Sequence, residues 1–288
     1  PVNNVILGCG GYENARALLW SQKQAKKNFL KDLQIGTYFN VHPGWPIARA
    51  IARMDNLENN LSKSLKSPMW GGTYILSPSQ KFINEKRIGN ISIRISEYNH
   101  RNSYKELLRE ILCVAPEYGK KIAELSGKKI VCSHLKIFGS AEQEPIETNK
   151  VTLSNTSFDD YGIPRIHLNF KLQDSVRDTM RVFAEEVAKF FISKDLGRIK
   201  IEDWLYDYSK KFSVHGRADR GGHHIGSTRM GNNANDSVVD RNLKVHNTNN
   251  LYVVGSSVFS TGGAVNPTLS ITQLSIRLAE RIVGPDDL

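Results

Sequence analysis

Two short apolar segments near the ends of the chain are each followed by a glycine turn and a helical pattern of apolar residues. Val5–Leu7 leads through Gly8–Gly11 into the helical pattern Glu13–Trp20. Asn250–Val254 also enters a glycine turn, and the amphipathic pattern Pro267–Val283 follows. Short, wholly apolar strands that alternate with helices are typical of an α/β layer. We therefore expect the chain to leave one such layer and to return to it more than 200 residues later.

The second helical pattern also predicts which of its residues are buried. Pro267 suits the first helical turn, where its missing N–H costs no hydrogen bond. The spacing of the apolar residues predicts one buried face, made of Leu269, Ile271, Leu274, Ile276, Leu278, Ala279 and Ile282.

The middle of the chain has a different, alternating pattern. In Gly89–Ser96 three isoleucines alternate with polar residues, which is typical of a strand with one covered face. Further strands are predicted at Lys129–Phe138, Lys150–Ser154 and Arg165–Phe170, with a turn at Asp159–Pro164. Helices are predicted at Ser103–Ile111 and at Ser175–Phe191, the latter with Val176, Met180, Phe183, Val187 and Phe190 on one face. The pattern as a whole predicts an α/β layer plus an α+β region with an antiparallel sheet.

The composition of the chain excludes few classes of binding partner. The chain has 288 residues, a net charge of +10 and a pI near 9.4, which could indicate nucleic acid as a partner. We instead predict a solvated basic surface, because the lysines are scattered along the chain without interleaved aromatic residues. No apolar run is long enough to span a bilayer, and nothing at the N-terminus has the form of a signal peptide. The compartment stays open.

The cysteines and histidines do not predict a metal site. Cys9, Cys113 and Cys132 are odd in number, widely spaced and form no CxxC motif. The eight histidines show no HExxH spacing. We expect neither a disulfide framework nor a metal ion.

The stretch His223–Gly231, with the sequence HHIGSTRMG, and the later run VNPTLSI with Asn266 carry the candidate chemistry. Histidine exchanges a proton near neutral pH at little cost, and an asparagine amide can donate a hydrogen bond to an oxygen that loses its proton. Such a pair suits the oxidation of an alcohol. The alternative is that both residues are ordinary parts of polar turns.

These segments resemble the C-terminal half of the glucose–methanol–choline (GMC) oxidoreductases, which oxidise alcohols and sugars with FAD. The resemblance is strongest over Gly221–Ile282, where HHIGSTRMG, SVVDRNLKVHNTNNLYVVGSSVF and NPTLSI occur in family order. It is good at GCGGYENARALLWS and at Ile35–Pro43, IGTYFNVHP, and diffuse between them. The HHIGSTRMG segment together with Asn266 resembles the bacterial sugar or polyol dehydrogenases and the pyranose oxidases more than the aryl-alcohol enzymes.

The resemblance implies roles for six residues. It selects His223, three residues before Gly226, as the catalytic histidine, and Asn266, before the proline of the NP motif, as its partner. Gly255, Ser256, Pro267 and Thr268 are implied to contact FAD. His224, Arg229 and Asp240 we expect to be structural, the last two through ion pairing.

The chain departs from the family in lacking the GxGxxG fingerprint that seats a dinucleotide. We therefore expect residues 1–40 and 215–288 to be parts of a discontinuous Rossmann-like FAD-binding domain, and residues 41–214 to form the antiparallel, helix-bearing substrate domain. The chain is then a fragment, or another polypeptide supplies the N-terminal FAD-binding half.

The leading hypothesis is an FAD-dependent oxidoreductase that acts on an alcohol or sugar and passes electrons to oxygen, a quinone or a cytochrome. The alternative is a non-catalytic scaffold or assembly subunit derived from such an enzyme. The intact pair His223 and Asn266 favours the enzyme, because a scaffold has no need of it.

Overall fold

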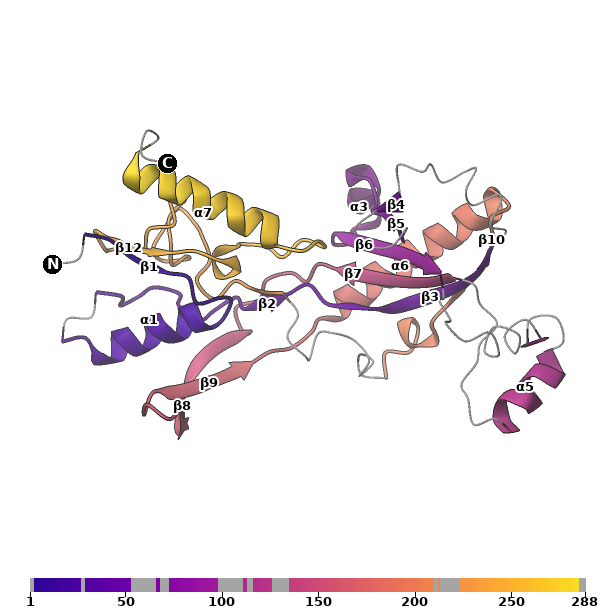
Figure 1. Ribbon diagram of the computed structural model, residues 1–288, viewed down its shortest axis with the longest axis horizontal. Coiled ribbons are helices and arrows are strands. Elements are labelled where there is room, and N and C mark those ends of the chain that lie inside the picture. The colour runs from indigo at the N-terminus through magenta and orange to yellow at the C-terminus, as the bar shows by residue number, and fades with distance from the viewer. Residues whose placement is uncertain are drawn as a thin grey trace. The chain divides into compact units, whose positions relative to one another are not determined.

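The computed structural model describes residues 3–26, 29–52, 66–67, 73–97, 111–112, 116–125, 135–209, 212 and 223–284 (Figure 1). The chain divides into two compact units. Unit 1 comprises Pro1–Pro43, Glu142–Val176 and Arg217–Leu288, and unit 2 comprises Gly44–Ala141 and Arg177–Gly216. The predicted helix Ser103–Ile111, apart from its last residue, and residues 129–134 of a predicted strand lie outside the described residues.

The two end segments, which the sequence predicted to share one α/β layer, pair directly with each other in unit 1. Strand β1 (Val5–Leu7) and strand β12 (Leu251–Val253) are parallel, with Val5 opposite Leu251. Helix α1 (Glu13–Gln24) follows the first strand, and helix α7 (Thr268–Val283) follows the second. Val5 and Ile6 are 40% and 50% exposed, so β1 is not a buried strand among the residues that the structure describes.

A buried asparagine in α1 joins these two strands at their carboxyl ends. The Asn14 side chain is fully buried, and its Oδ1 accepts a hydrogen bond from the Cys9 N–H at 2.8 Å. Its Nδ2 donates to the Val254 carbonyl at 2.9 Å and to Ser257 Oγ at 2.8 Å. One amide therefore connects the turn after β1, the end of β12 and the short 3-10 helix η4 (Ser256–Val258).

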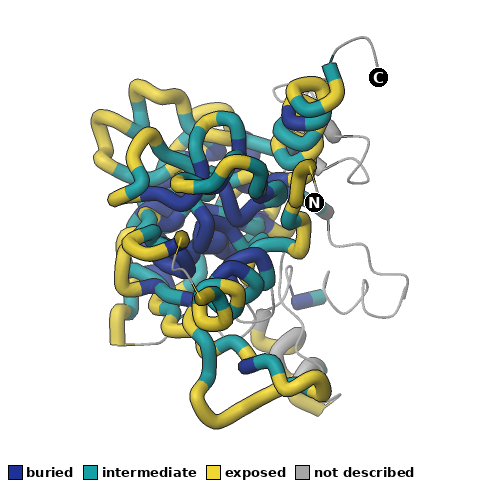
Figure 2. Tube along the Cα trace, turned by 90° about the vertical axis from the view of Figure 1, so that its left-hand side faces the viewer, coloured by how far each residue is buried: buried dark blue, intermediate teal, exposed yellow. Residues whose placement is uncertain are grey.

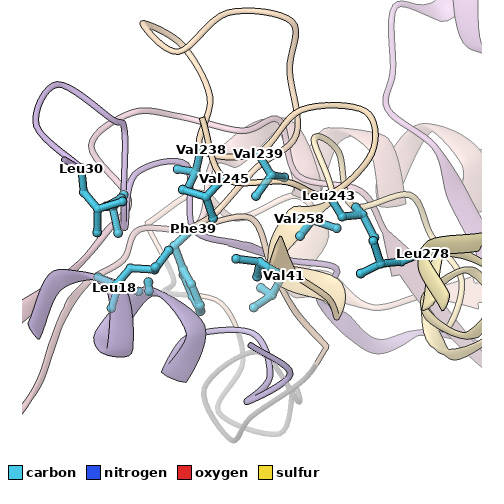
Figure 3. Packing of buried hydrophobic residues seen from close by; sticks show 14 residues of the cluster. Leu18, Leu30, Phe39, Val41, Val238, Val239, Leu243, Val245, Val258 and Leu278 are labelled. Atoms are coloured by element: carbon cyan, nitrogen blue, oxygen red, sulfur yellow. The ribbon is translucent and has the colours of Figure 1, made fainter. Parts of the chain in front are cut away.

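The hydrophobic core of unit 1 draws on segments from all three of its parts (Figure 3). Leu18 of α1, Phe39 and Val41 contribute from the first part, and Val151 contributes from the second. The third part supplies Val238, Val239, Leu243, Val245, Val253, Val258 and Leu278. Burying an aliphatic side chain is worth about 1.5–3 kcal/mol, so this shared core stabilises the association of the three parts.

Helix α7 buries less of its apolar face than predicted. Leu278 is buried, and Leu274 and Ile282 pack against the core. Leu269 and Ile276, however, are 70% and 52% exposed, so their assignment to the core is wrong in the described structure. The helix next to the C-terminus carries exposed residues in Figure 2. Val283 continues the same exposed stripe, because residues seven apart lie on one side of a helix.

Unit 2 is built on a six-stranded antiparallel sheet in the order β10-β3-β7-β6-β5-β4. Its strands are β3 (Gly44–Ala52), β4 (Lys66–Ser67), β5 (Thr73–Leu76), β6 (Ile91–Glu97), β7 (Leu135–Ala141) and β10 (Gly197–Ile201). The predicted alternation in β6 is confirmed, since Ile91, Ile93 and Ile95 are buried. The sequence did not predict β3, because Pro46 interrupts its pattern; the register shifts between Pro46 and Ala48, which accommodates the proline.

The helices of unit 2 include α3 (Gln80–Lys86), α5 (Pro116–Leu125) and most of α6 (Asp174–Ser193), followed by the 3-10 helix η3 (Asp203–Leu205). On α6 the predicted face is confirmed except at its end, where Phe191 is fully buried and Phe190 is partly exposed. None of the described helices is both long and apolar enough to span a bilayer.

Strands β8 (Lys150–Phe158) and β9 (Pro164–Asn169) correct one part of the prediction. They form a separate antiparallel hairpin in unit 1, not part of the large sheet. Arg16 of α1 contacts the turn of this hairpin and pairs with Asp159 at 2.6 Å. Residues 142–176 thus fold with the ends of the chain, whereas the sequence had grouped them in one region from 41 to 214.

Removal of the Asn14 amide tests its bridging role. We expect Asn14→Ala to lower the free energy of unfolding by about 2–3 kcal/mol, because it leaves buried polar groups without partners. Urea unfolding followed by circular dichroism measures the change. The exposed Asn155 of β8 provides the control, and Asn155→Ala should change stability by less than about 0.5 kcal/mol. Equal losses in the two variants would contradict the bridging role.

Candidate active site

The segment from His224 to Met230 is hydrogen-bonded along both of its edges. On one edge, strand β11 (His224–Ile225) pairs antiparallel with β2 (Asn40–Val41). Farther along this edge, the Ser227 carbonyl accepts from the Gly36 N–H at 2.6 Å. On the other edge, the N–H groups of Gly226, Thr228 and Met230 donate to the carbonyls of Ser256, Ser257 and Val258. The segments that carried the family resemblance therefore meet at the histidine motif.

Glycines allow these backbones to approach closely. Gly226 has φ +76°, and a Cβ placed there would lie 2.1 Å from the Tyr38 carbonyl oxygen. A Cβ on Gly11 would lie 2.3 Å from the Cβ of His224. Ser227, itself at φ +67°, donates its hydroxyl to the Gly11 carbonyl at 2.6 Å. The motif thus needs glycine at 226 for both conformation and space.

His223 lies against a second histidine, His42, which the sequence did not indicate as a site residue. Its Nδ1 is 2.6 Å from Nε2 of His42, and the two rings are stacked with centroids 4.6 Å apart. His42 is buried, and His223 is partly exposed. The only earlier signal for His42 was its place in the segment IGTYFNVHP, which carries no spacing typical of a site.

His224 points to the opposite face, as adjacent residues in a strand do. Its ring packs edge-on against Tyr12 at 4.7 Å and lies 5.6 Å from Phe39. Burial, and to a lesser extent the charge of His223, lower the pKa of His224 below its ordinary value of 6.5. These contacts suit a structural residue that stays neutral.

The loop that carries Asn266 passes the face of the ladder on which Asn40 and Ile225 lie. A methyl group added to Gly262 would lie 3.5 Å from Ile225 Cδ1 and 3.9 Å from Asn40 Nδ2. The next residue, Gly263, donates its N–H to the Glu142 carboxylate at 3.1 Å. Asn266 itself is exposed, and Pro267 behind it is buried. Within the described residues, His223 contacts His42 and is not hydrogen-bonded to Asn266.

The four residues expected at the cofactor lie at two places in unit 1. Gly255, at φ +111°, and Ser256 stand between β12 and η4. Ser256 donates its hydroxyl to the His224 carbonyl at 2.5 Å, so its side chain holds the histidine segment. Pro267 is the N-cap of α7, and Thr268 is exposed in the first turn.

Arg229 and Asp240 hold loops together by hydrogen bonds, and the expected ion pairing is wrong for both in the described part of the chain. The Arg229 guanidinium lies 3.6 Å from the centre of the Tyr38 ring, and its Nε donates to the Asp236 carbonyl at 2.8 Å. Asp240 Oδ1 accepts from the N–H groups of Asn242 and Lys244 at 2.8 and 3.0 Å. Asp240 is therefore a turn residue.

An open groove of about 520 Å³ lies elsewhere in unit 1, along α7. Its lining comprises Met230, Val258, Phe259, Ser260, Thr261, Ser270, Gln273, Leu274 and Arg277. Neither His223 nor Asn266 contributes to it, so the groove is separate from the histidine pair.

Residues 145–275 match the family model described as GMC oxidoreductase. The chain is 31% identical over 150 residues to 2-methyl-1,2-propanediol dehydrogenase of Mycolicibacterium austroafricanum, covering 52% of this chain and 25% of that protein. It is 26% identical over 238 residues to the fructose dehydrogenase large subunit of Gluconobacter japonicus, covering 80% of this chain and 40% of that protein. The chain thus spans less than half the length of either relative.

A solved structure of formate oxidase superposes with a TM-score of 0.51 and 20% identity, over 96% of this chain and 53% of that one. This similarity extends to the fold and covers nearly the whole chain. Together with the family match, it confirms the resemblance inferred from the sequence motifs.

Substitution of alanine for two glycines with similar backbone angles distinguishes the cost of the left-handed conformation from the cost of a close contact. Gly226 and Gly162 have φ of +76° and +74°, but a Cβ at Gly162 meets no atom within 4 Å. We expect Gly162→Ala to cost about 1–2 kcal/mol, the price of a left-handed alanine. Gly226→Ala should cost clearly more, because the Tyr38 backbone must move. Thermal unfolding compares the variants, and equal costs would show that the close contact is unimportant.

The lowered pKa of His224 predicts a pH-dependent stability. Because its pKa is lower in the folded protein than in the unfolded chain, the unfolded chain binds protons first as the pH falls. His224 therefore contributes its full stabilisation of the fold above pH 6.5, and this contribution decreases as the pH falls below that value. Urea midpoints at about pH 7.5 and about pH 5.5 should differ less in His224→Phe than in the wild type. The same difference in both proteins would contradict this assignment.

Proposed function

The chain is related to the GMC oxidoreductases, and on this basis we propose that it forms one side of the active site of an FAD-dependent enzyme that oxidises an alcohol or sugar hydroxyl. The observation that supports this most is the convergence of the segments around His223. The loop that leads to Asn266 crosses the same ladder, which favours a shared site for the two side chains.

His223 is the proposed base. A neutral imidazole accepts the substrate hydroxyl proton near neutral pH, which contributes about 10²–10⁴-fold to rates of this kind. Asn266 donates its amide N–H to the same substrate oxygen and holds it in place. Asn266 is exposed, so its amide is accessible to a substrate.

The residues proposed to hold FAD have chemistry that fits it. The first turn of α7 is exposed and has no side-chain cap, so its N–H groups and the positive end of the helix dipole suit an electron-rich ring. Gly255 lacks a Cβ and allows close approach of the backbone, while Ser256 contributes through its main chain because its hydroxyl is engaged. FAD, when bound, supplies the hydride acceptor.

We propose that FAD binding also needs a polypeptide region with the dinucleotide fingerprint, in a longer chain or in a separate subunit. Both curated relatives extend far beyond the matched region, and one of them is named a large subunit. The apolar side chains exposed on β1 and α7 would be covered by such a region. Unit 1 then contains the FAD-binding residues, while most of residues 41–214 contribute to substrate recognition.

The names of the relatives favour a polyol or sugar as substrate. Oxygen, a quinone or a cytochrome accepts the electrons.

Absorbance in the flavin bands tests the proposal directly. We expect it in the purified chain after mixing with the polypeptide encoded upstream, or in the longer chain; its absence from both would favour the scaffold.

The exchange of His223 for alanine tests the chemistry. We expect His223→Ala to slow flavin reduction by substrate by about 10²–10⁴-fold while FAD stays bound, because only the proton acceptor is lost. Anaerobic stopped-flow absorbance measures the rate. His167, exposed on β9, gives the control variant His167→Ala, which should reduce flavin at the wild-type rate. An unchanged rate in His223→Ala would rule out the proposed role.

A further inference from the structure

The strongest unassigned feature is the contact between His42 and His223. Nε2 of His42 and Nδ1 of His223 are 2.6 Å apart, and their rings are nearly parallel, with an angle of 25° between the planes. His42 is only 8% exposed. A buried ring nitrogen at this distance from another imidazole shares a proton with it, one ring donating and the other accepting.

The backbone enforces this contact. In the ladder of β2 and β11, Val41 lies opposite His224 and Asn40 lies opposite Ile225. If this pairing is extended by one residue on each strand, His42 lies opposite His223. Side chains directly opposite in an antiparallel pair lie on one face, within reach of each other.

Buried hydrogen bonds fix the position of β2. Asn40 is 1% exposed, and its Nδ2 donates to the Gln143 carbonyl at 2.7 Å. Its Oδ1 accepts from the Val41 N–H at 2.8 Å. The bond within β2 orients the Asn40 amide, and β2 cannot shift without breaking the Asn40–Gln143 bond and the ladder with β11, so His42 can hold the other ring in one orientation.

We propose that His42 is a positioning residue that fixes the tautomer and the ring orientation of His223, an inference that rests on the proposed function of His223 as the base. The contact uses Nδ1 of His223, so proton exchange with a substrate has to use Nε2. A base oriented by a third group is a recurrent arrangement in enzymes, because it keeps the reactive nitrogen in one place and one protonation form.

Two substitutions separate this role from simple packing. His42→Phe keeps a flat ring of similar size but has no nitrogen to share a proton. His42→Gln places an amide close to the position of Nε2 and can still donate or accept. If His42 only packs against His223, Phe should replace it without loss. If His42 positions His223, Gln should restore the effect and Phe should not.

The first measurement needs no flavin. In ¹⁵N-histidine NMR of the protein, with His223 assigned through His223→Gln, we expect its two ring nitrogens to have well-separated shifts that indicate one tautomer. His42→Phe should average them, and His42→Gln should restore the separation. An unchanged spectrum of His223 in His42→Phe overturns the proposal.

The second measurement uses the flavin-loaded enzyme. Loss of a group that orients a reactive side chain costs about 10–100-fold, as at metal sites, and we expect this loss in the rate of flavin reduction by His42→Phe. KM should stay nearly constant, and His42→Gln should recover most of the rate. A wild-type rate in His42→Phe overturns the positioning role even if the tautomer changes. Failure of the proposed function is recognised separately, since His223→Ala would then also reduce flavin at the wild-type rate.

Discussion

Unit 1 depends on one constraint, which is that the backbone of residues 224–230 is hydrogen-bonded on both edges at once. Residues 36–41 occupy one edge, and residues 256–258 occupy the other. The close approach of these segments leaves no space for a Cβ at Gly226, which would meet the Tyr38 carbonyl, or at Gly11, which would meet His224. The glycines of the histidine motif and of the N-terminal turn are therefore required by packing between backbones, and the same packing sets where the histidine side chains lie.

This arrangement divides the two adjacent histidines between different environments. His224, together with Phe39 and Val41, faces the hydrophobic core and is held neutral there by burial. His223 faces the side on which His42 lies and past which the loop to Asn266 runs. A strand that presents one residue to a core and its neighbour to a polar face gives the His223 imidazole a rigid support without burying it.

The sequence predicted the features that depend on local pattern. The return of the chain to one α/β layer, the alternating isoleucines of β6 and helix α6 all follow from periodicity, whereas the direct pairing of β1 with β12 does not. The β8–β9 hairpin was assigned to the wrong unit because alternation shows that a strand has a covered face, but not which sheet covers it.

Strand β3 was missed because Pro46 disrupts its pattern, and β2 was missed because a two-residue strand has no period. His42 could not be selected for the same reason, since only the register of β2 with β11 brings it to His223. Leu269 and Ile276 have the spacing of core residues, and helical spacing cannot distinguish a face covered by this chain from one left exposed.

The parallel pairing of β1 with β12 also has a consequence for how the protein is made. Asn14 bonds to a carbonyl that lies 240 residues farther along the chain, and the core of unit 1 needs side chains from all three of its parts. Contacts of such long sequence separation form slowly, because the entropy of closing the loop is lost before any contact is gained. During synthesis, residues 3–41 can therefore complete their packing only after η4 has been made, while the intervening segments of unit 2 are already available to fold. Residues of α1 such as Ala15 and Leu18 can pack early against Phe39 and Val151, but their core is complete only when the third part of unit 1 has been added.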